Sequence, residues 1–283
     1  MNSIVPARTA RRRRRATGPA VALGLAAAAL LAASCATYPA QGLPPGTLES
    51  DGAVSVIEAA RWTAFVPARP GPDSGRAGFI FYPGAYVAPE AYAPWLRRLA
   101  ESGRVAVAVK VPFGVALLGA GRAAAVMEAF PETRAWALGG HSLGGVAAAS
   151  FASKTLGRRA AGNADGNFVA GIAFLASYPA GGADLSAAPW PVLSLSASED
   201  LLATAADIEE YRRLLPPHAA FRVVEGGNHA GFGSYGAQKG DGASTLAVGA
   251  QADLVVSELA EFLAAVEVWA ALSAGPDADP GTD

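Results

Sequence analysis

The sequence contains a single cysteine, at position 35, among its 283 residues. One cysteine excludes an internal disulfide framework and a zinc site built from several cysteines. Its three histidines lack metal-ligand spacing, and the chain has no phosphate-binding loop or dinucleotide fingerprint, so we expect no metal and no other cofactor. Charged residues make up only 16% of the chain and apolar residues 52%, which excludes intrinsic disorder.

Positive charge is scarce in the body of the chain. Six of the 22 basic residues are Arg8 and the run from Arg11 to Arg15, whereas all 24 acidic residues lie beyond Cys35. The body is therefore acidic and carries no basic stripe. Nucleic-acid binding depends largely on neutralising phosphates, so we expect no nucleic-acid partner.

Residues 1–34 have the pattern of a signal peptide. A basic segment without acidic residues precedes an apolar run of 14 residues from Ala20 to Ala33. That run is too short to span about 30 Å of hydrocarbon and fits a signal-peptide core. Residues 31–35, at the end of this run and just beyond it, read Leu-Ala-Ala-Ser-Cys, which resembles a bacterial lipobox. The resemblance implies a lipid anchor on Cys35 and a location on the outer side of the cytoplasmic membrane; plain secretion and an uncleaved anchor remain open.

The rest of the chain divides into three parts. Residues 35–52 are rich in Pro and Gly and predict a flexible tether, residues 53–272 predict one globular domain, and residues 273–283 predict a disordered tail. Short apolar runs alternate with longer helical stretches in the domain, which predicts an α/β fold with a mostly parallel sheet covered on both faces. We expect strands at 54–58, 62–66, 78–82, 105–111, 135–138, 168–175, 191–196 and 221–225, and helices at 92–102, 122–130, 146–154, 204–215 and 251–272.

Residues 140–144 read Gly-His-Ser-Leu-Gly, a Gly-x-Ser-x-Gly motif between a predicted strand and a predicted helix. In that context the serine sits on a sharp turn that only small neighbours permit. Ser142 is therefore the candidate nucleophile, with a helix N-cap as the alternative. The backbone N–H of Leu143 then lies at a helix start, where it can stabilise an oxyanion.

These residues resemble the α/β-hydrolase superfamily, and more narrowly its dienelactone-hydrolase-like branch. The resemblance covers about residues 53–270 and is carried by the segments 82–92, 139–145 and 226–229. It implies an α/β-hydrolase fold and a chain order of serine, acid and histidine. Dienelactone hydrolases themselves use a cysteine nucleophile, whereas this chain has Ser142.

His229 is the candidate general base. It follows a predicted strand in a Gly-rich loop, and parallel sheets place ligand groups at such carboxyl ends. His141 lies beside Ser142, and we expect its side chain to point away from the site. His218 follows two prolines in a turn, where we expect exposure to solvent.

The acid is expected after the strand at 191–196. Asp200 lies in that loop and could orient His229, and the resemblance also favours it because related chains carry Asp-x-x-Ala-Thr here. Glu199 is the local rival. Thr204 and Asp207 predict a helix N-cap pattern, which leaves 198–203 as free loop.

Several residues are expected to surround the site. Ala85 or Tyr86, at the end of the strand that conventionally supplies it, is expected to provide the second oxyanion N–H. Tyr178, Phe232 and Tyr86 are candidate pocket walls. The stretch between Leu175 and Pro191 is too short for a cap domain, so we expect an open site.

The complete set of triad residue types favours an enzyme, a serine hydrolase of small carboxylic esters, thioesters or lactones. Two alternatives remain open. One is a non-catalytic hydrolase fold that serves as a surface binding lipoprotein, and the other is an acyltransferase with the same triad. The expected partners are a small-molecule ester substrate and, through Cys35, a membrane.

Overall fold

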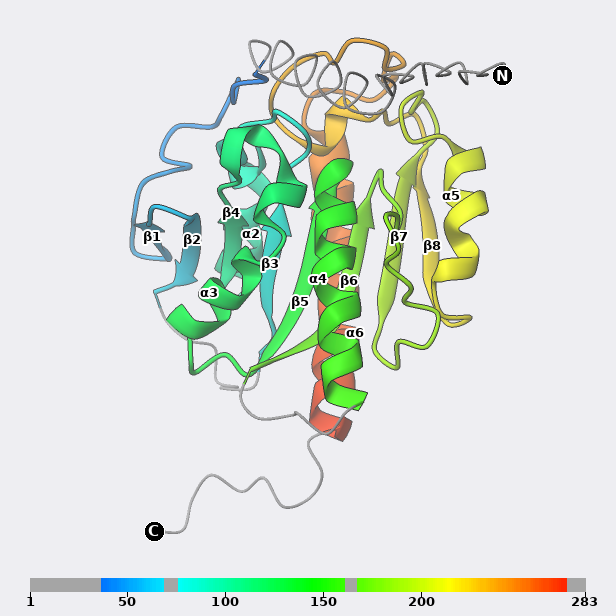
Figure 1. Ribbon diagram of the computed structural model, residues 1–283. Coiled ribbons are helices and arrows are strands. Elements are labelled where there is room, and N and C mark those ends of the chain that lie inside the picture. Colours follow the sequence, from blue (N-terminus) through cyan, green and yellow to red (C-terminus); the bar gives the residue numbers. More distant parts are fainter. Residues whose placement is uncertain (1–36, 69–75, 161–166, 274–283) are drawn as a thin grey trace, which may run out of the picture. The chain divides into compact units, whose positions relative to one another are not determined.

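The computed structural model describes residues 37–68, 76–160 and 167–273 (Figure 1). The predicted signal peptide, the predicted lipidation site at Cys35 and the tail from residue 274 lie outside the described residues.

In the described part of the chain, eight strands form one sheet in the order β1-β2-β4-β3-β5-β6-β7-β8. The pairs β1–β2 and β2–β4 are antiparallel and the remaining pairs are parallel, which confirms the predicted mostly parallel α/β sheet. The strands are β1 (Val54–Glu58), β2 (Trp62–Pro67), β3 (Gly78–Tyr82), β4 (Ala106–Val109), β5 (Ala135–His141), β6 (Phe168–Leu175), β7 (Val192–Ala197) and β8 (Ala220–Val224).

Helices cover both faces of the sheet, with α4 in front of it and α6 behind it in Figure 1. None of the described helices is long and apolar enough to cross a bilayer. The α-helices are α2 (Ala93–Glu101), α3 (Arg122–Ala129), α4 (Leu143–Ala160), α5 (Ala205–Tyr211) and α6 (Ala250–Ser273), and the 3-10 turns are η1 (Pro89–Tyr92), η2 (Pro112–Gly114), η3 (Ala116–Gly119), η4 (Arg212–Leu214) and η5 (Ala230–Phe232).

The strand β3 shows how the two cores form. Successive side chains of a strand point to opposite faces. Phe79 and Phe81 pack with apolar residues of α2 and α6, whereas Ile80 and Tyr82 pack with those of α3 and α4. A strand buried on both faces must be apolar throughout, and all five residues of β3 are buried.

The connection from β6 to β7, residues 176–191, contains no helix or strand. No cap domain is inserted there, as the sequence predicted. Between β6 and β7, therefore, only a loop lies at the carboxyl ends of the parallel strands.

Residues 37–52, for which the sequence predicted a flexible tether, are bonded to the domain. The carbonyl groups of Gly46 and Glu49 accept hydrogen bonds from the guanidinium of Arg97, at 3.3 and 2.6 Å, and Asp51 forms an ion pair with it. The tether prediction is therefore wrong for these residues, because Arg97 is buried and takes its partners from this segment. We call residues 37–52 the N-terminal arm.

Candidate active site

Ser142 occupies the turn between β5 and α4, where its φ angle is +53°. Residues other than glycine rarely adopt this left-handed conformation, and it costs about 1–3 kcal/mol. The turn is held by two hydrogen bonds, Ser142 N–H to Leu175 O at 3.0 Å and Gly145 N–H to Ser142 O at 3.0 Å. The sequence context predicted this strained strand-to-helix turn.

Two glycines permit the close packing of this turn. A Cβ on Gly140 would lie 2.2 Å from the carbonyl carbon of Gly144, and a Cβ on Gly144 would lie 2.1 Å from the backbone oxygen of Tyr82. Both distances are far inside van der Waals contact, so a side chain at either position would displace backbone. The glycines of the motif are thus required by the approach of α4 to β3 and β5.

His229 and Asp200 form a buried pair at the carboxyl edge of the sheet. His229 Nδ1 lies 2.8 Å from Asp200 Oδ2, and both side chains are almost fully excluded from solvent. The other oxygen of Asp200 accepts hydrogen bonds from the backbone N–H groups of Leu202 and Ala203, at 2.7 and 2.8 Å. With Nδ1–H donating to this carboxylate, the Nε2 atom of His229 is left as the acceptor of a proton.

Glu199, the rival acid, does not face His229. Its carboxylate accepts a hydrogen bond from the Ser198 hydroxyl at 3.0 Å, in an exposed position. The loop beyond ends in the predicted cap, since Thr204 and Asp207 form a capping box at the start of α5. The backbone of this loop therefore turns Asp200 inward and Glu199 outward.

Two polar residues that sequence reasoning missed hold the histidine loop. Asp241 accepts hydrogen bonds from the backbone N–H groups of His229 and Ala230, at 3.2 and 2.8 Å. Gln251 bonds both the N–H and the C=O of Asn228, at 3.1 and 2.8 Å. Asp241 precedes a glycine in a loop, a common pattern for side-chain-to-backbone bonding, but its partners could not be read from the sequence.

The His141 ring lies against that of the candidate base, a contact that the sequence did not predict. Its ring centroid is 4.5 Å from that of His229, and its Nδ1 is 2.9 Å from the Tyr92 hydroxyl. That hydroxyl accepts the N–H of Gly84 at 3.0 Å, so we assign its proton to a bond with Nδ1 of a neutral His141. Burial lowers the pKa of His141 well below its ordinary value, and the neighbouring His229 lowers it further.

One of the two backbone amides that the sequence offered as an oxyanion donor in the loop after β3 is already hydrogen-bonded. The N–H of Tyr86 donates to Gly114 O at 2.8 Å, so the expectation that Tyr86 serves as a donor is wrong. The N–H of Ala85 has no acceptor among the described residues, and neither does that of Leu143, the first residue of α4. These two amides remain the candidates for an oxyanion site.

The expected pocket walls differ in their exposure. Tyr178 and Tyr86 are half-buried, and Tyr178 stacks on Tyr211 with ring centroids 4.4 Å apart. Phe232 is fully buried, with its ring centroid 5.7 Å from that of His141, and it is one of the residues that line the cavity described next, so its role as a pocket wall stays a prediction. Phe232 lies in the core because the Trp95 side chain donates a hydrogen bond to its carbonyl and fixes the turn inward.

A cavity of about 1120 Å³ lies beside this site and not in it. It is lined by residues of the N-terminal arm, by α2 from Pro94 to Glu101, by the first turn of α6, and by Asn228, the segment 230–237 and residues within 244–249; Ser142, Asp200 and His229 do not line it. His218, as expected, is exposed, with its Nε2 atom 3.1 Å from the Trp190 carbonyl.

Fold and site together match one known family. The sequence model of the alpha/beta hydrolase family matches residues 78–253, which include Ser142, Asp200 and His229. The chain therefore belongs to the alpha/beta hydrolase family. No curated protein sequence matches it.

Solved structures with a similar fold include three esterases of low sequence identity. Esterase B from Lactobacillus rhamnosis is 12% identical with a TM-score of 0.56, covering 90% of this chain and 96% of that one. A thermophilic esterase from Thermogutta terrifontis is 16% identical (TM-score 0.53; 83% and 97% covered). An esterase from Pyrobaculum calidifontis is 17% identical (TM-score 0.52; 92% and 96% covered). At this identity the likeness establishes the fold alone.

We expect Asp200→Asn to lower kcat/KM by about 10³–10⁴-fold, because the amide cannot hold the histidine tautomer or stabilise its charged form. Glu199→Gln, the neighbouring control, should stay within about twofold of the parent, since a solvated charge contributes little. Steady-state kinetics on a p-nitrophenyl ester measure both, with thermal unfolding as the check on folding. Equal losses in the two variants would reject Asp200 as the acid.

Proposed function

We propose that the protein is a serine hydrolase of small carboxylic esters, thioesters or lactones. In this proposal Ser142 is the nucleophile, His229 the general base and Asp200 the carboxylate that orients it. The observation that carries it is the buried 2.8 Å contact between His229 Nδ1 and Asp200 Oδ2. The remaining Nε2 atom of His229 is buried and has no hydrogen-bond partner among the described residues, so in this proposal it is the atom that takes the serine proton. The esterase structures of similar fold agree with this substrate class.

The reaction runs in two halves on these residues. Ser142 Oγ attacks the ester carbonyl carbon while His229 Nε2 takes the serine proton. The oxyanion is stabilised by the N–H groups of Leu143 and Ala85, and the carboxylate of Asp200 stabilises the charged imidazole. His229 returns the proton to the leaving alcohol, which leaves an acyl group on Ser142. Water, deprotonated by His229, then attacks the acyl-enzyme, and His229 gives that proton to Ser142 Oγ as the acid is released.

Within the family, we propose a place in the dienelactone-hydrolase-like branch with serine as the nucleophile. Labelling with a fluorophosphonate, followed by a screen of p-nitrophenyl esters, tests the proposal. A labelled Ser142 peptide and turnover of at least one ester are expected. A protein that is neither labelled nor active would favour a binding lipoprotein, and labelling with transfer only to an added alcohol would favour an acyltransferase.

We also propose that the protein is exported and carries a lipid on Cys35. The support is the basic and apolar leader followed by Leu-Ala-Ala-Ser-Cys at 31–35. Mass spectrometry of the membrane-fraction protein should give a diacylated or triacylated peptide that begins at Cys35. An unmodified mature N-terminus at another residue would move the proposal to plain secretion.

We expect short-acyl esters to be the better substrates, with kcat/KM falling for long chains and without interfacial activation. The connection 176–191 supplies no lid, and the cavity beside the site is not lined by Ser142, Asp200 or His229, so no apolar groove leads from the nucleophile to cover a long tail in the described residues. Covering each methylene is worth about 0.8 kcal/mol, so a long-chain lipase needs an extended apolar groove. The measurement is kcat/KM for p-nitrophenyl butyrate against the laurate. A preference for laurate would contradict this expectation.

A further inference from the structure

The N-terminal arm begins at the edge of the candidate active site. The N–H of Tyr38 donates to Tyr86 O at 2.8 Å, and the N–H of Ala88 donates to Tyr38 O at 2.9 Å. This pairing fixes the arm to the loop that carries the Ala85 amide. Two residues separate Tyr38 from Cys35, and the three steps of chain between their Cα atoms span at most about 11 Å. A lipid on Cys35 would therefore be held close to this edge of the domain.

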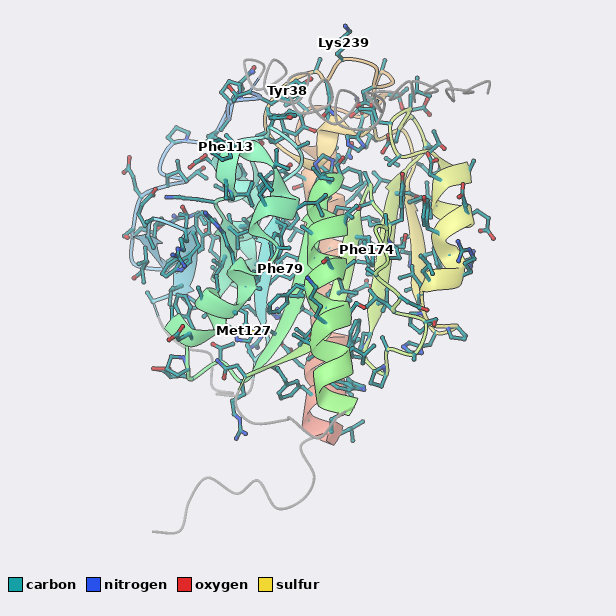
Figure 2. All side chains as sticks on the ribbon, in the orientation of Figure 1. Tyr38, Phe79, Phe113, Met127, Phe174 and Lys239 are labelled. Atoms are coloured by element: carbon teal, nitrogen blue, oxygen red, sulfur yellow. The ribbon has the colours of Figure 1, made fainter. Side chains whose placement is uncertain are left out.

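The loop 112–119 lies at the same edge and exposes apolar side chains. Gly114 O accepts the N–H of Tyr86 at 2.8 Å, so this loop and the arm bond the same residue. The Phe113 side chain is 79% exposed, and those of Leu118 and Leu117 are 63% and 47% exposed. Figure 2 labels Phe113 and Tyr38 in the upper part of the domain, well away from Met127.

The backbone of Phe113 is strained in this exposed position. Its φ angle is +54°, a conformation that is unfavourable for an aromatic residue. A strained backbone that holds a large apolar ring in solvent gains nothing for the fold of the isolated domain. Such features are concentrated at functional surfaces, and exposed apolar clusters mark contact sites.

Positive charge adjoins this loop although the body of the protein is acidic. Arg122 begins the helix after the loop, and its Cδ would lie 3.3 Å from a Cβ on Gly119. Burial lowers the pKa of Arg122, and repulsion from the nearby Arg61 lowers it further. Among the described residues neither arginine has a carboxylate partner, in contrast to Lys110, which pairs with Glu58. An apolar cluster with unpaired arginines is complementary to anionic lipid headgroups over acyl chains.

We propose that the loop 112–119, with Arg61 and Arg122, docks on an anionic phospholipid bilayer and turns the candidate active site toward the membrane surface. The proposal rests on the proposed lipidation of Cys35. Acyl chains on a cysteine hold a protein at a membrane but leave it free to rotate about the connecting residues. The apolar loop supplies the second contact that selects one orientation. Short-acyl esters that partition to the bilayer surface would then reach Ser142 directly.

A nitroxide label at residue 113 tests this docking. Because Cys35 is the only cysteine, its acylation leaves the thiol of a Phe113→Cys variant as the single labelling site. The full chain, purified from membranes with its lipid, is placed in vesicles that contain phosphatidylglycerol. The matched control is Leu272→Cys, an exposed position (80%) at the carboxyl end of α6.

The measurement is the ratio of the label's accessibility to oxygen over its accessibility to a water-soluble nickel chelate. We expect this ratio to be about fivefold higher at residue 113 than at residue 272. The ratio should fall in pure phosphatidylcholine vesicles and in an Arg61→Gln/Arg122→Gln background. A label at 113 as open to water as that at 272, on protein with acylated Cys35, would overturn the docking and leave the lipidation standing.

Two further outcomes would also overturn the proposal. Mass spectrometry that finds Cys35 unmodified would remove the anchor on which it rests. A label at 113 that is shielded in detergent solution, together with a doubled protein mass in ultracentrifugation, would assign the loop to contact with a second copy of this chain.

Discussion

Replacing Ser142 with alanine is expected to abolish ester hydrolysis, with a loss of about 10⁶-fold in kcat, while the fold stays intact. Without the hydroxyl no acyl-enzyme can form, and only oxyanion and binding effects remain. Alanine keeps the same strained backbone at +53°, so the unfolding temperature should be close to that of the parent. The measurement is steady-state turnover of p-nitrophenyl butyrate on protein free of contaminating esterase.

Ser142→Gly provides the control for folding in this experiment. Glycine adopts the left-handed conformation without strain, so this variant should be inactive and more stable by about 1 kcal/mol. Loss of activity together with a gain in stability cannot come from unfolding. Retained turnover in either variant would end the assignment of Ser142 as the nucleophile.

His229→Ala is expected to cost nearly as much as the serine change, about 10⁴-fold or more in kcat/KM. Members of a triad act as a unit, so the double variant Ser142→Ala/His229→Ala should lose little beyond either single one. His229 is buried, and a cavity could itself disturb the fold. His229→Gln, which fills similar space without a basic nitrogen in the proton-transfer range, should therefore be equally inactive with less loss of stability.

His218→Ala is the matched control, because His218 is exposed and, in the described part of the chain, its ring forms a hydrogen bond only with the Trp190 carbonyl, at 3.1 Å. Its kcat/KM should stay within about twofold of the parent. The pH dependence of kcat/KM gives the second readout: the low-pH limb should persist in His218→Ala. A His229→Gln protein with parental activity and pH profile would require another base.

Two of the strands that are buried on both faces could be predicted closely from the sequence, whereas the predicted strand 135–138 ends three residues before β5 does. The predicted ranges 78–82 and 168–175 coincide with β3 and β6, since a continuous apolar run of that length has few other uses. The start of α4 was predicted three residues late, at residue 146. Gly144 and Gly145 have low helix propensity, so the sequence does not predict a helix across them. The helix nevertheless begins at Leu143, where the close packing of the turn requires glycine.

Only those features of the candidate site that depend on residues close together in the sequence could be predicted. Ser142 at a strained turn, and the direction of the Thr204 cap, both follow from neighbouring residues. The position of His141 and the use of the Tyr86 amide by Gly114 depend on segments far apart in the chain. The packing of the N-terminal arm on the domain depends on Arg97. No local sequence pattern predicts that this arginine is buried.

The burial of His141 also links the stability of the protein to acidity. Its lowered pKa means that the folded chain excludes a proton which the unfolded chain binds below about pH 6.5. As the pH falls through that value, this residue shifts the equilibrium toward the unfolded state, and the urea midpoint should decrease between pH 7.5 and 5. The proposed export would place the protein at the pH of its surroundings, without cytoplasmic buffering. The His141 imidazole, which packs against the candidate base, would then set the lower limit of the pH range in which this domain stays folded.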